Sequence, residues 1–220
     1  MHKTLMAFKV LDLNGWKMID LFSPELDQLK KREFKRNETI YDQGDDPRAL
    51  YLIEEGIVGL THTSETGHDT LFRVFSKGYI FGHRSLLAQE KYHASAVCLT
   101  SAKIYEISEP EFKKIYEKNP EILRKLAKVL AKELGASELR ISGLQDKSAH
   151  HRIVESLVFL KLKHPEYTWT RKEIADFAGS TLESVVRVIS SMQEKGLLKK
   201  EGRKFHLLDY EKALEAASSI

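Results

Sequence analysis

The pattern of apolar and polar residues divides the chain into three segments. Between about Glu33 and Ile107, short runs of β-branched and aromatic residues alternate with Gly, Asp and Pro, as in ETIYDQGDDP and ALYLIEEGIVGL. Five glycines recur at intervals of roughly one strand plus one turn: Gly44, Gly56, Gly67, Gly78 and Gly82. This spacing predicts a small antiparallel roll whose interior can hold one small ligand.

From Pro120 the apolar residues recur every three or four positions, as in an amphipathic helix. The apolar positions are Ile122, Leu126, Val129, Leu130, Leu134, Leu139 and Ile141. An apolar stripe of this length has no obvious surface in its own domain to pack against. It therefore predicts that the helix pairs with its own copy in a homodimer. The alternative is a helix that lies on the roll.

After Ser148 the sequence predicts three helices and a hairpin. A T-x-x-E capping box, Thr170 with Glu173, begins the second helix. After a short Gly-containing turn, the third helix runs from about Thr181 to Lys195. The stretch LLKKEGRKFHLL predicts two short strands around Gly202. Two helices joined by a short turn and followed by a hairpin are typical of a winged helix-turn-helix.

The predicted fold class is therefore α+β, with a β-roll (jelly roll) in residues 1–116, a long dimerisation helix and hinge in 117–146, and a winged helix-turn-helix in 147–220. A chain of 220 residues is long enough for two domains. Its 42% hydrophobic and 30% charged residues are ordinary for a folded protein. The absence of a long apolar run or a signal peptide favours a cytoplasmic protein without a membrane partner.

Cysteine content and charge narrow the function further. The single cysteine, Cys98, cannot form an intramolecular disulfide or hold a four-thiolate iron–sulfur cluster, and its alternating surroundings predict a buried structural thiol. The net charge of +3 is too small to indicate a partner. The segment from Arg152 to His206, however, contains 11 Lys or Arg and 7 Asp or Glu. Its excess of 4 positive charges favours a polyanion partner for the C-terminal third.

The chain resembles the family of the cyclic-AMP receptor protein and the fumarate–nitrate reduction regulator (CRP/FNR), which are bacterial transcription factors. The resemblance covers NETIYDQGDDPRALYLIEEGIVGL in the roll, the Phe-Gly turn at Gly82, the long helix, and TRKEIADFAGSTLESVVRVISSMQEKGLL. It implies a homodimer whose third C-terminal helix enters the major groove of each half of a palindromic double-stranded DNA site. It also implies RNA polymerase as a partner.

In that family the third helix recognises bases, and the resemblance places Glu183 and Arg187 in this role. The two residues are four apart on one helix face, so Arg187 can donate to guanine and Glu183 can accept from cytosine. Leu182 and Val186 depart from the family's base-contacting residues, which leaves the half-site open. Candidates for phosphate contacts are Thr170, Arg171, Thr181 and Ser184.

Each of these assignments has an alternative. Glu183 stands three residues after Ser180 and could instead complete a capping box with it. Arg187 could be a solvated helix residue. The cations of the predicted hairpin could face phosphates or form an ordinary soluble surface; they are Lys199, Lys200, Arg203 and Lys204.

The stretch FGHRSLLAQEKYHASA, residues 81–96, corresponds to the family's cyclic-nucleotide pocket. Cyclic-AMP-binding members have a glutamate for the ribose and an arginine for the phosphate where this chain has His83 and His93. A neutral imidazole lacks the fixed charge and fork geometry of arginine, so we expect no cyclic-AMP binding in the usual mode. The candidate effector pocket comprises Gly82, His83, Arg84, Ser85, His93, Ala94, Ser95 and, from the long helix, Ser137.

Three interpretations of the roll stay open. It could bind an unidentified small molecule through Arg84, Ser85, His93 and Ser95, or need no effector. It could also be a haem-based gas sensor, since imidazole is a common haem ligand; the histidines considered are His2, His62, His68, His83 and His93. A regulatory subunit that no longer binds DNA is a further alternative. An enzyme is not expected, because the sequence has no metal-spacing cluster, P-loop or nucleophile with a general base.

Overall fold

The structure, a computed structural model, describes residues 18, 22, 25–202 and 204–218. The described residues form two compact units, one up to Leu134 and the other from Gly135 onward. The division falls inside the predicted long helix, and the predicted domain boundaries after residues 116 and 146 stay a prediction. Within the described ranges, no helix is both long and apolar enough to cross a membrane.

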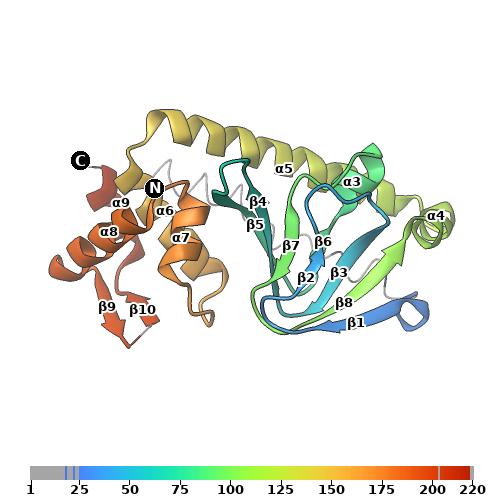
Figure 1. Ribbon diagram of the computed structural model, residues 1–220, viewed down its shortest axis with the longest axis horizontal. Helices are drawn as coiled ribbons and strands as arrows, with labels where there is room; N and C mark the ends of the chain where they lie inside the picture. The colour runs from blue at the N-terminus through green and yellow to red at the C-terminus, as the bar shows by residue number, and fades with distance from the viewer. Residues whose placement is uncertain (1–17, 19–21, 23–24, 203, 219–220) are drawn as a thin grey trace. The chain divides into compact units, whose positions relative to one another are not determined.

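The first unit contains a roll of two four-stranded antiparallel sheets (Figure 1). One sheet has the strand order β1-β8-β3-β6, and the other has the order β2-β7-β4-β5. The strands are β1 (Lys30–Phe34), β2 (Thr39–Tyr41), β3 (Ala49–Glu55), β4 (Ile57–Thr63), β5 (Asp69–Ser76), β6 (Ile80–Phe81), β7 (Ser95–Cys98) and β8 (Ala102–Ser108).

The first five residues of β3, Ala49–Ile53, are apolar because both faces of this part of the strand are covered. Tyr51 and Ile53 belong to the core inside the roll, whereas the alternate residues Leu50 and Leu52 belong to a second core that includes helical residues. Cys98 is fully buried inside the roll, and burial raises the pKa of its thiol to about 11. The prediction of a buried structural thiol is therefore confirmed.

The chain passes from one sheet to the other at Gly56, between β3 and β4. This glycine has φ +101°, and a Cβ atom there would lie 2.6 Å from the carbonyl oxygen of Ser101. The left-handed conformation and the close approach both require glycine. Gly56 thereby allows the two sheets to approach closely at this corner.

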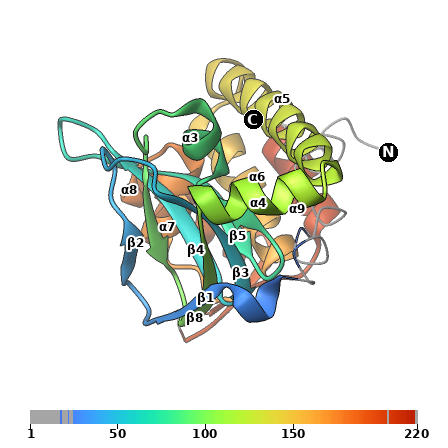
Figure 2. The same cartoon turned by 90° about the vertical axis from the view of Figure 1, so that its right-hand side faces the viewer.

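Helix α3 (His83–Ala88) lies between β6 and β7, and α4 (Glu109–Lys118) and α5 (Glu121–Asp146) follow β8. Figure 2 shows α4 and the first part of α5 along one side of the roll. Ile122, Leu126 and Val129 of α5 are buried in the same core as Leu50 and Leu52. We expected the apolar stripe of α5 to have no surface in its own domain to pack against. This is wrong for the first half of the helix, because these residues cover the outer face of β3.

The second unit contains α6 (Ala149–Lys163), α7 (Arg171–Ala178), α8 (Leu182–Glu194), the hairpin β9 (Leu198–Glu201) and β10 (Lys204–Leu207), and α9 (Tyr210–Ser218). Its core includes Trp169, Ile174, Val185 and Phe205, all nearly inaccessible to solvent. The order of helices and hairpin confirms the predicted winged helix-turn-helix, and the described residues have the predicted α+β fold class.

Candidate nucleic-acid interface and roll pocket

The predicted capping box at the start of α7 is present. The Thr170 hydroxyl accepts a hydrogen bond from the backbone N–H of Glu173 at 3.1 Å, and the Glu173 carboxylate accepts from the Thr170 N–H at 2.7 Å. The other carboxylate oxygen of Glu173 accepts from the Tyr167 hydroxyl at 2.6 Å. The box fixes where the helix begins, and it leaves the Thr170 hydroxyl proton available to an external acceptor.

Two arginines hold the turn between α7 and α8. Arg152 donates to the carbonyl oxygens of Ala178 at 3.3 Å and Gly179 at 3.1 Å. Arg140 donates to the Phe177 carbonyl oxygen and places its guanidinium 4.7 Å from the centre of the Phe177 ring. These donors satisfy carbonyl groups that the end of α7 leaves without intrahelical partners. The turn that sets the direction of α8 is thus fixed by cations from α5 and α6.

Thr181 caps α8. Its hydroxyl accepts from the Ser184 backbone N–H at 3.2 Å and donates to the Ser184 hydroxyl at 3.1 Å, and Arg187 donates to the same Ser184 hydroxyl at 3.3 Å. The N-cap is therefore Thr181, with Ser184 as the third helical residue. The alternative of a capping box between Ser180 and Glu183 is wrong, because Glu183 is only the second residue of the helix.

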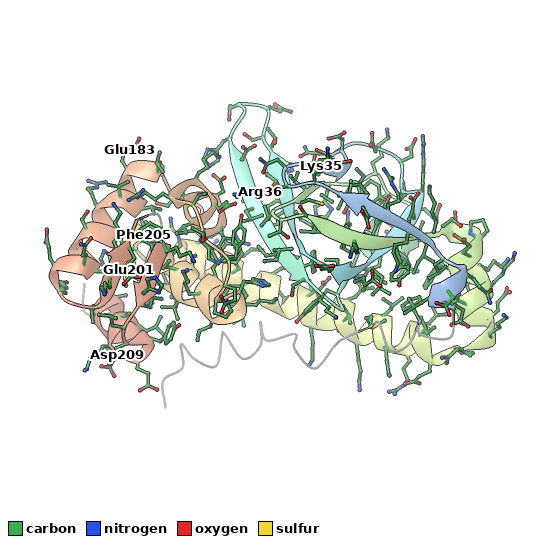
Figure 3. The ribbon with its side chains drawn as sticks, turned by 90° about the horizontal axis from the view of Figure 1, so that it is seen from below. Lys35, Arg36, Glu183, Glu201, Phe205 and Asp209 are labelled. Atoms are coloured by element: carbon green, nitrogen blue, oxygen red, sulfur yellow. The ribbon has the colours of Figure 1, made fainter. Side chains whose placement is uncertain are left out.

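The outer face of α8 carries Glu183 and Arg187, both exposed. Figure 3 shows Glu183 at the end where the helix begins. A hydrogen bond from its own backbone N–H, together with the nearby Thr181 hydroxyl and the charge of Arg187, lowers the pKa of the Glu183 carboxyl. It is therefore ionised at neutral pH and can accept hydrogen bonds. Val185, Val188, Ile189 and Met192 fill the opposite, buried face.

Phe205 of the hairpin lies against Arg171, one of the residues predicted to contact phosphate. The guanidinium carbon of Arg171 lies 5.3 Å from the centre of the Phe205 ring, and Phe205 is anchored in the core (Figure 3). Lys199, Lys200 and Lys204 are all exposed on the hairpin, and Lys199 pairs with Glu201 at 2.8 Å. Arg203 lies outside the described residues.

In the roll, His83 contacts a carboxylate of α5. Gly82, with φ +77°, turns the chain into α3, and His83 follows with 3% of its side chain exposed. Its Nε2 lies 3.5 Å from Oε2 of Glu133, while the other oxygen of Glu133 lies 2.8 Å from Nη1 of Arg73 on β5. Burial alone would raise the pKa of Glu133, but the His83 ring and the Arg73 charge outweigh it and keep the pKa below the ordinary value.

His93 is held by Arg84, another predicted pocket residue. Arg84 donates to Nδ1 of His93 at 3.1 Å and pairs with Glu90 at 3.0 Å. Although the His93 side chain is exposed, partial desolvation by the atoms around its ring, followed by the charges of Arg84 and Arg73, lowers the pKa of His93. The imidazole is therefore neutral at pH 7, with Nδ1 as an acceptor. Its ring stacks on Phe72 with 5.9 Å between the ring centres.

The other predicted pocket residues occupy varied environments. Ser85 and Ala94 are 2% exposed, and the Ser85 hydroxyl donates to the Lys91 carbonyl oxygen at 3.3 Å. The Ser95 hydroxyl accepts from the Gln43 backbone N–H at 2.9 Å. Ser137 belongs to the second unit, and its role as a pocket residue stays a prediction. Within the described ranges, no group of three or more His, Cys, Asp or Glu is arranged to hold a metal ion. His2 lies outside the described residues.

Two family models match the chain: a cyclic nucleotide-binding domain over residues 31–119 and a Crp-like helix-turn-helix domain over residues 151–216. The cyclic AMP receptor protein of Thermus thermophilus is 27% identical over 176 residues, which are 79% of this chain and 82% of that protein. The transcriptional activator protein anr of Pseudomonas aeruginosa is 25% identical, over 84% of this chain and 80% of that protein. This chain is a member of the CRP/FNR family of transcription regulators.

A solved structure has a similar fold. The c-di-GMP responsive global regulator CLP of Xanthomonas campestris has a TM-score of 0.76 at 22% identity, covering 86% of this chain and 99% of that one. CRP/FNR proteins are transcription regulators and not enzymes, and their helix-turn-helix domains bind DNA, typically as dimers. The expectation that the protein is not an enzyme is confirmed by this membership.

Sequence reasoning missed four residues that position the sites of this CRP/FNR member. They are Arg73, Glu133, Arg140 and Arg152. Glu133 had a readable signal, because it stands four residues after Val129 and seven after Leu126, on the stripe that faces the roll. A charged residue on a buried stripe requires a partner. The arginines had no such signal, because their partners are distant in sequence.

Proposed function

We propose that this CRP/FNR member is a homodimeric, sequence-specific transcription regulator that inserts α8 of each subunit into the major groove of a palindromic DNA site. The observation that carries the proposal is the exposed pair Glu183 and Arg187 on α8. The ionised Glu183 can accept from the N4 amino group of cytosine, and Arg187 can donate to O6 and N7 of guanine. Together they would recognise one G·C base pair in each half-site.

The predicted phosphate contacts support this orientation. Thr170 and Thr181 cap α7 and α8, with Arg171 and Ser184 in the first turns. Helix N-termini carry partial positive charge and attract phosphates. The neighbouring hairpin adds the exposed Lys200 and Lys204. Contacts of this kind set the position of the protein on the duplex without selecting a sequence.

Dimerisation is proposed through a second row of residues on α5. The row repeats at alternating steps of four and three: Leu123, Ala127, Leu130, Leu134, Ser137, Ile141 and Leu144. Leu134 and Ile141 are 61% and 57% exposed. Alternating steps of three and four are the pattern of a coiled-coil seam, so the row would pair with the same row of a second copy.

For the roll, we propose that cyclic AMP is not bound in the usual mode. His83, at the ribose position, lies against Glu133, and His93, at the phosphate position, is neutral and bound to Arg84. The relatives do not fix an effector, since one is named a cyclic AMP receptor protein and another is described as c-di-GMP responsive. An unidentified ligand and no effector both stay open. A haem ligand would require His83 or His93 to release its partner.

Cytoplasmic location and contact with RNA polymerase follow from the proposed role as further predictions. The experiment that tests the proposal is selection from a random duplex pool with purified, ligand-free protein. We expect enrichment of an inverted repeat with one invariant G·C pair in each half. Enrichment of a site without two-fold symmetry would contradict the proposal, and no enrichment would contradict sequence-specific binding by the ligand-free protein. Repeating the selection with Arg187→Ala should remove the invariant G·C pair.

A further inference from the structure

The last two turns of α5 contact the turn between α7 and α8. The guanidinium carbon of Arg140 lies 4.7 Å from the centre of the Phe177 ring, and the same guanidinium donates to the Phe177 carbonyl oxygen. One turn further along α5, Leu144 packs against Gly179, where an added Cβ atom would lie 3.3 Å from Cδ2 of Leu144. Arg140 and Leu144 are four residues apart, so both can reach the same turn from one side of the helix.

The Phe177 ring has a second support on α6. It stacks on the Phe159 ring, with 5.6 Å between the ring centres and 8° between the ring planes. The ammonium group of Lys163 lies 5.5 Å from the centre of the Phe159 ring. Stacked rings attract each other, and a cation over a ring face is attracted by the ring quadrupole. Arg140, Phe159, Lys163 and Phe177 therefore form one group, the α5–α7 clamp.

The connection between α5 and α6 is braced as well. Arg152 of α6 donates to the Lys147 carbonyl oxygen at 2.8 Å, in addition to its bonds to Ala178 and Gly179. The Lys147 ammonium group pairs with the Glu155 carboxylate at 2.6 Å. A hinge requires residues whose backbone can absorb a large rotation. Because this connection is bonded to α6 through both its backbone and its side chain, the end of α5 and the helices after it form a stiff body.

The same end of α5 carries the last three residues of the proposed coiled-coil seam: Ser137, Ile141 and Leu144. Arg140 and Ile141 are adjacent in sequence, so their side chains point about 100° apart around the helix. Arg140 can therefore hold Phe177 while Ile141 meets a second copy of the chain. The seam and the clamp share one helix, and α8 follows the clamped turn directly. The clamp thus fixes the direction of α8 relative to the seam.

We infer that the α5–α7 clamp determines which spacing between two half-sites the dimer accepts. Each base pair added to the spacer moves the second half-site by about 3.4 Å and turns it by about 34°. Recognition helices that are fixed to the seam match one spacer, whereas loosely attached helices can follow several. The clamp residues contact no base in this account, so they select the spacer and not the sequence of a half-site. The inference rests on the proposed DNA-binding function and adds a specificity determinant to it.

The test is a set of anisotropy titrations at fixed salt on the selected inverted repeat and on duplexes whose spacer is one base pair longer or shorter. For wild type we expect at least about 10-fold weaker binding to either altered spacer, because both half-sites cannot be engaged at once. Arg140→Ala should reduce this penalty by about 3- to 10-fold, the effect of losing a cation–π contact and a hydrogen bond. Phe177→Leu removes the ring but keeps an apolar side chain, and it should reduce the penalty in the same way.

Two controls separate the clamp from base recognition and from charge. Binding of Arg140→Ala and Phe177→Leu to a duplex with a single intact half-site should equal that of wild type. Arg124→Ala removes an exposed cation of α5 that pairs with Glu121 of the same helix, and it should keep the wild-type spacer profile. Circular dichroism and sedimentation velocity confirm that the variants are folded and dimeric.

Other outcomes would overturn the inference. Folded, dimeric Arg140→Ala and Phe177→Leu proteins that reject the altered spacers as strongly as wild type would show that the clamp does not set the spacing. A wild type that prefers the inverted repeat to a scrambled duplex but accepts all three spacers equally would also refute it, and the proposed function would stand. If wild type does not prefer the inverted repeat to a scrambled duplex, the proposed function fails and the inference fails with it.

Discussion

The imidazole of His83 and the carboxylate of Glu133 lie 3.5 Å apart, with 3% and 9% of their side chains exposed. The contact links α3, at the predicted effector pocket, to α5, the proposed dimer helix. Arg73 completes the group from β5 at 2.8 Å. A buried carboxylate is stable only with such partners. The group therefore ties three elements of the roll unit together.

Glu133→Gln should destabilise the roll unit by about 2–4 kcal/mol, because a buried charge pair loses one partner. Calorimetric unfolding measures this loss. Glu138→Gln, at an exposed position of the same helix, is the matched control and should change little. If Glu133→Gln and Glu138→Gln unfold at the same temperature, the contacts of Glu133 contribute nothing to stability.

The stability contribution of Glu133 should disappear in acid. Its folded pKa is lowered, so the unfolded state binds more protons, and the contribution is complete above the unfolded pKa of about 4.3. It is lost as the pH falls through the lowered folded value. We therefore expect wild type and Glu133→Gln to differ in urea midpoint at pH 7 and to converge well below pH 4. A constant difference across this range would refute the assigned ionisation.

His164, at the end of α6, gives the second unit its own pH dependence. Burial, followed by the charge of Lys163, lowers the pKa of His164 to about 4. Since an unfolded histidine titrates near 6.5, the native unit loses stability as the pH falls from about 6.5 to about 4. An imidazole resonance titrating near pH 4 in NMR spectra, absent from His164→Leu, would confirm this. Titration of that resonance near 6.5 would contradict it.

The proposed coiled-coil seam on α5 is tested by Leu134→Glu. A charge at the centre of the seam should shift the protein from dimer to monomer in sedimentation velocity experiments. Leu162→Glu is the control, because Leu162 is similarly exposed but lies on α6, outside the seam. A Leu134→Glu protein that stays dimeric would place the dimer contact elsewhere.

Arg187→Ala and Lys200→Ala should weaken DNA binding in different ways. Removing Arg187 is expected to cost about 1–3 kcal/mol on the selected site and to relax discrimination at one base pair. Removing Lys200, an exposed cation of the hairpin, should weaken binding to all duplexes equally and reduce the salt slope by about 1. Anisotropy titrations at several salt concentrations separate the two effects. A uniform loss for Arg187→Ala would argue against base recognition.

The sequence predicts most of the fold because its signals are local. The glycine spacing of the roll, the capping box of Thr170 with Glu173, and the hairpin around Gly202 each depend on neighbouring residues. The α5 helix was only partly predictable. Its apolar residues form two rows, and periodicity cannot tell which row meets the roll and which stays exposed. The contact between His83 and Glu133 joins residues 50 positions apart, so no local pattern contains it.

The most direct test of the central claim is an anisotropy titration of ligand-free protein at near-physiological salt on the inverted repeat recovered by selection. The comparison duplexes have one or both half-sites scrambled. We expect binding to the intact repeat to be at least about 10³-fold tighter than to the fully scrambled duplex, with the half-scrambled duplex in between. Equal affinity for the intact and half-scrambled duplexes would contradict a symmetric dimer. Equal affinity for all three would contradict sequence-specific DNA binding by the ligand-free protein.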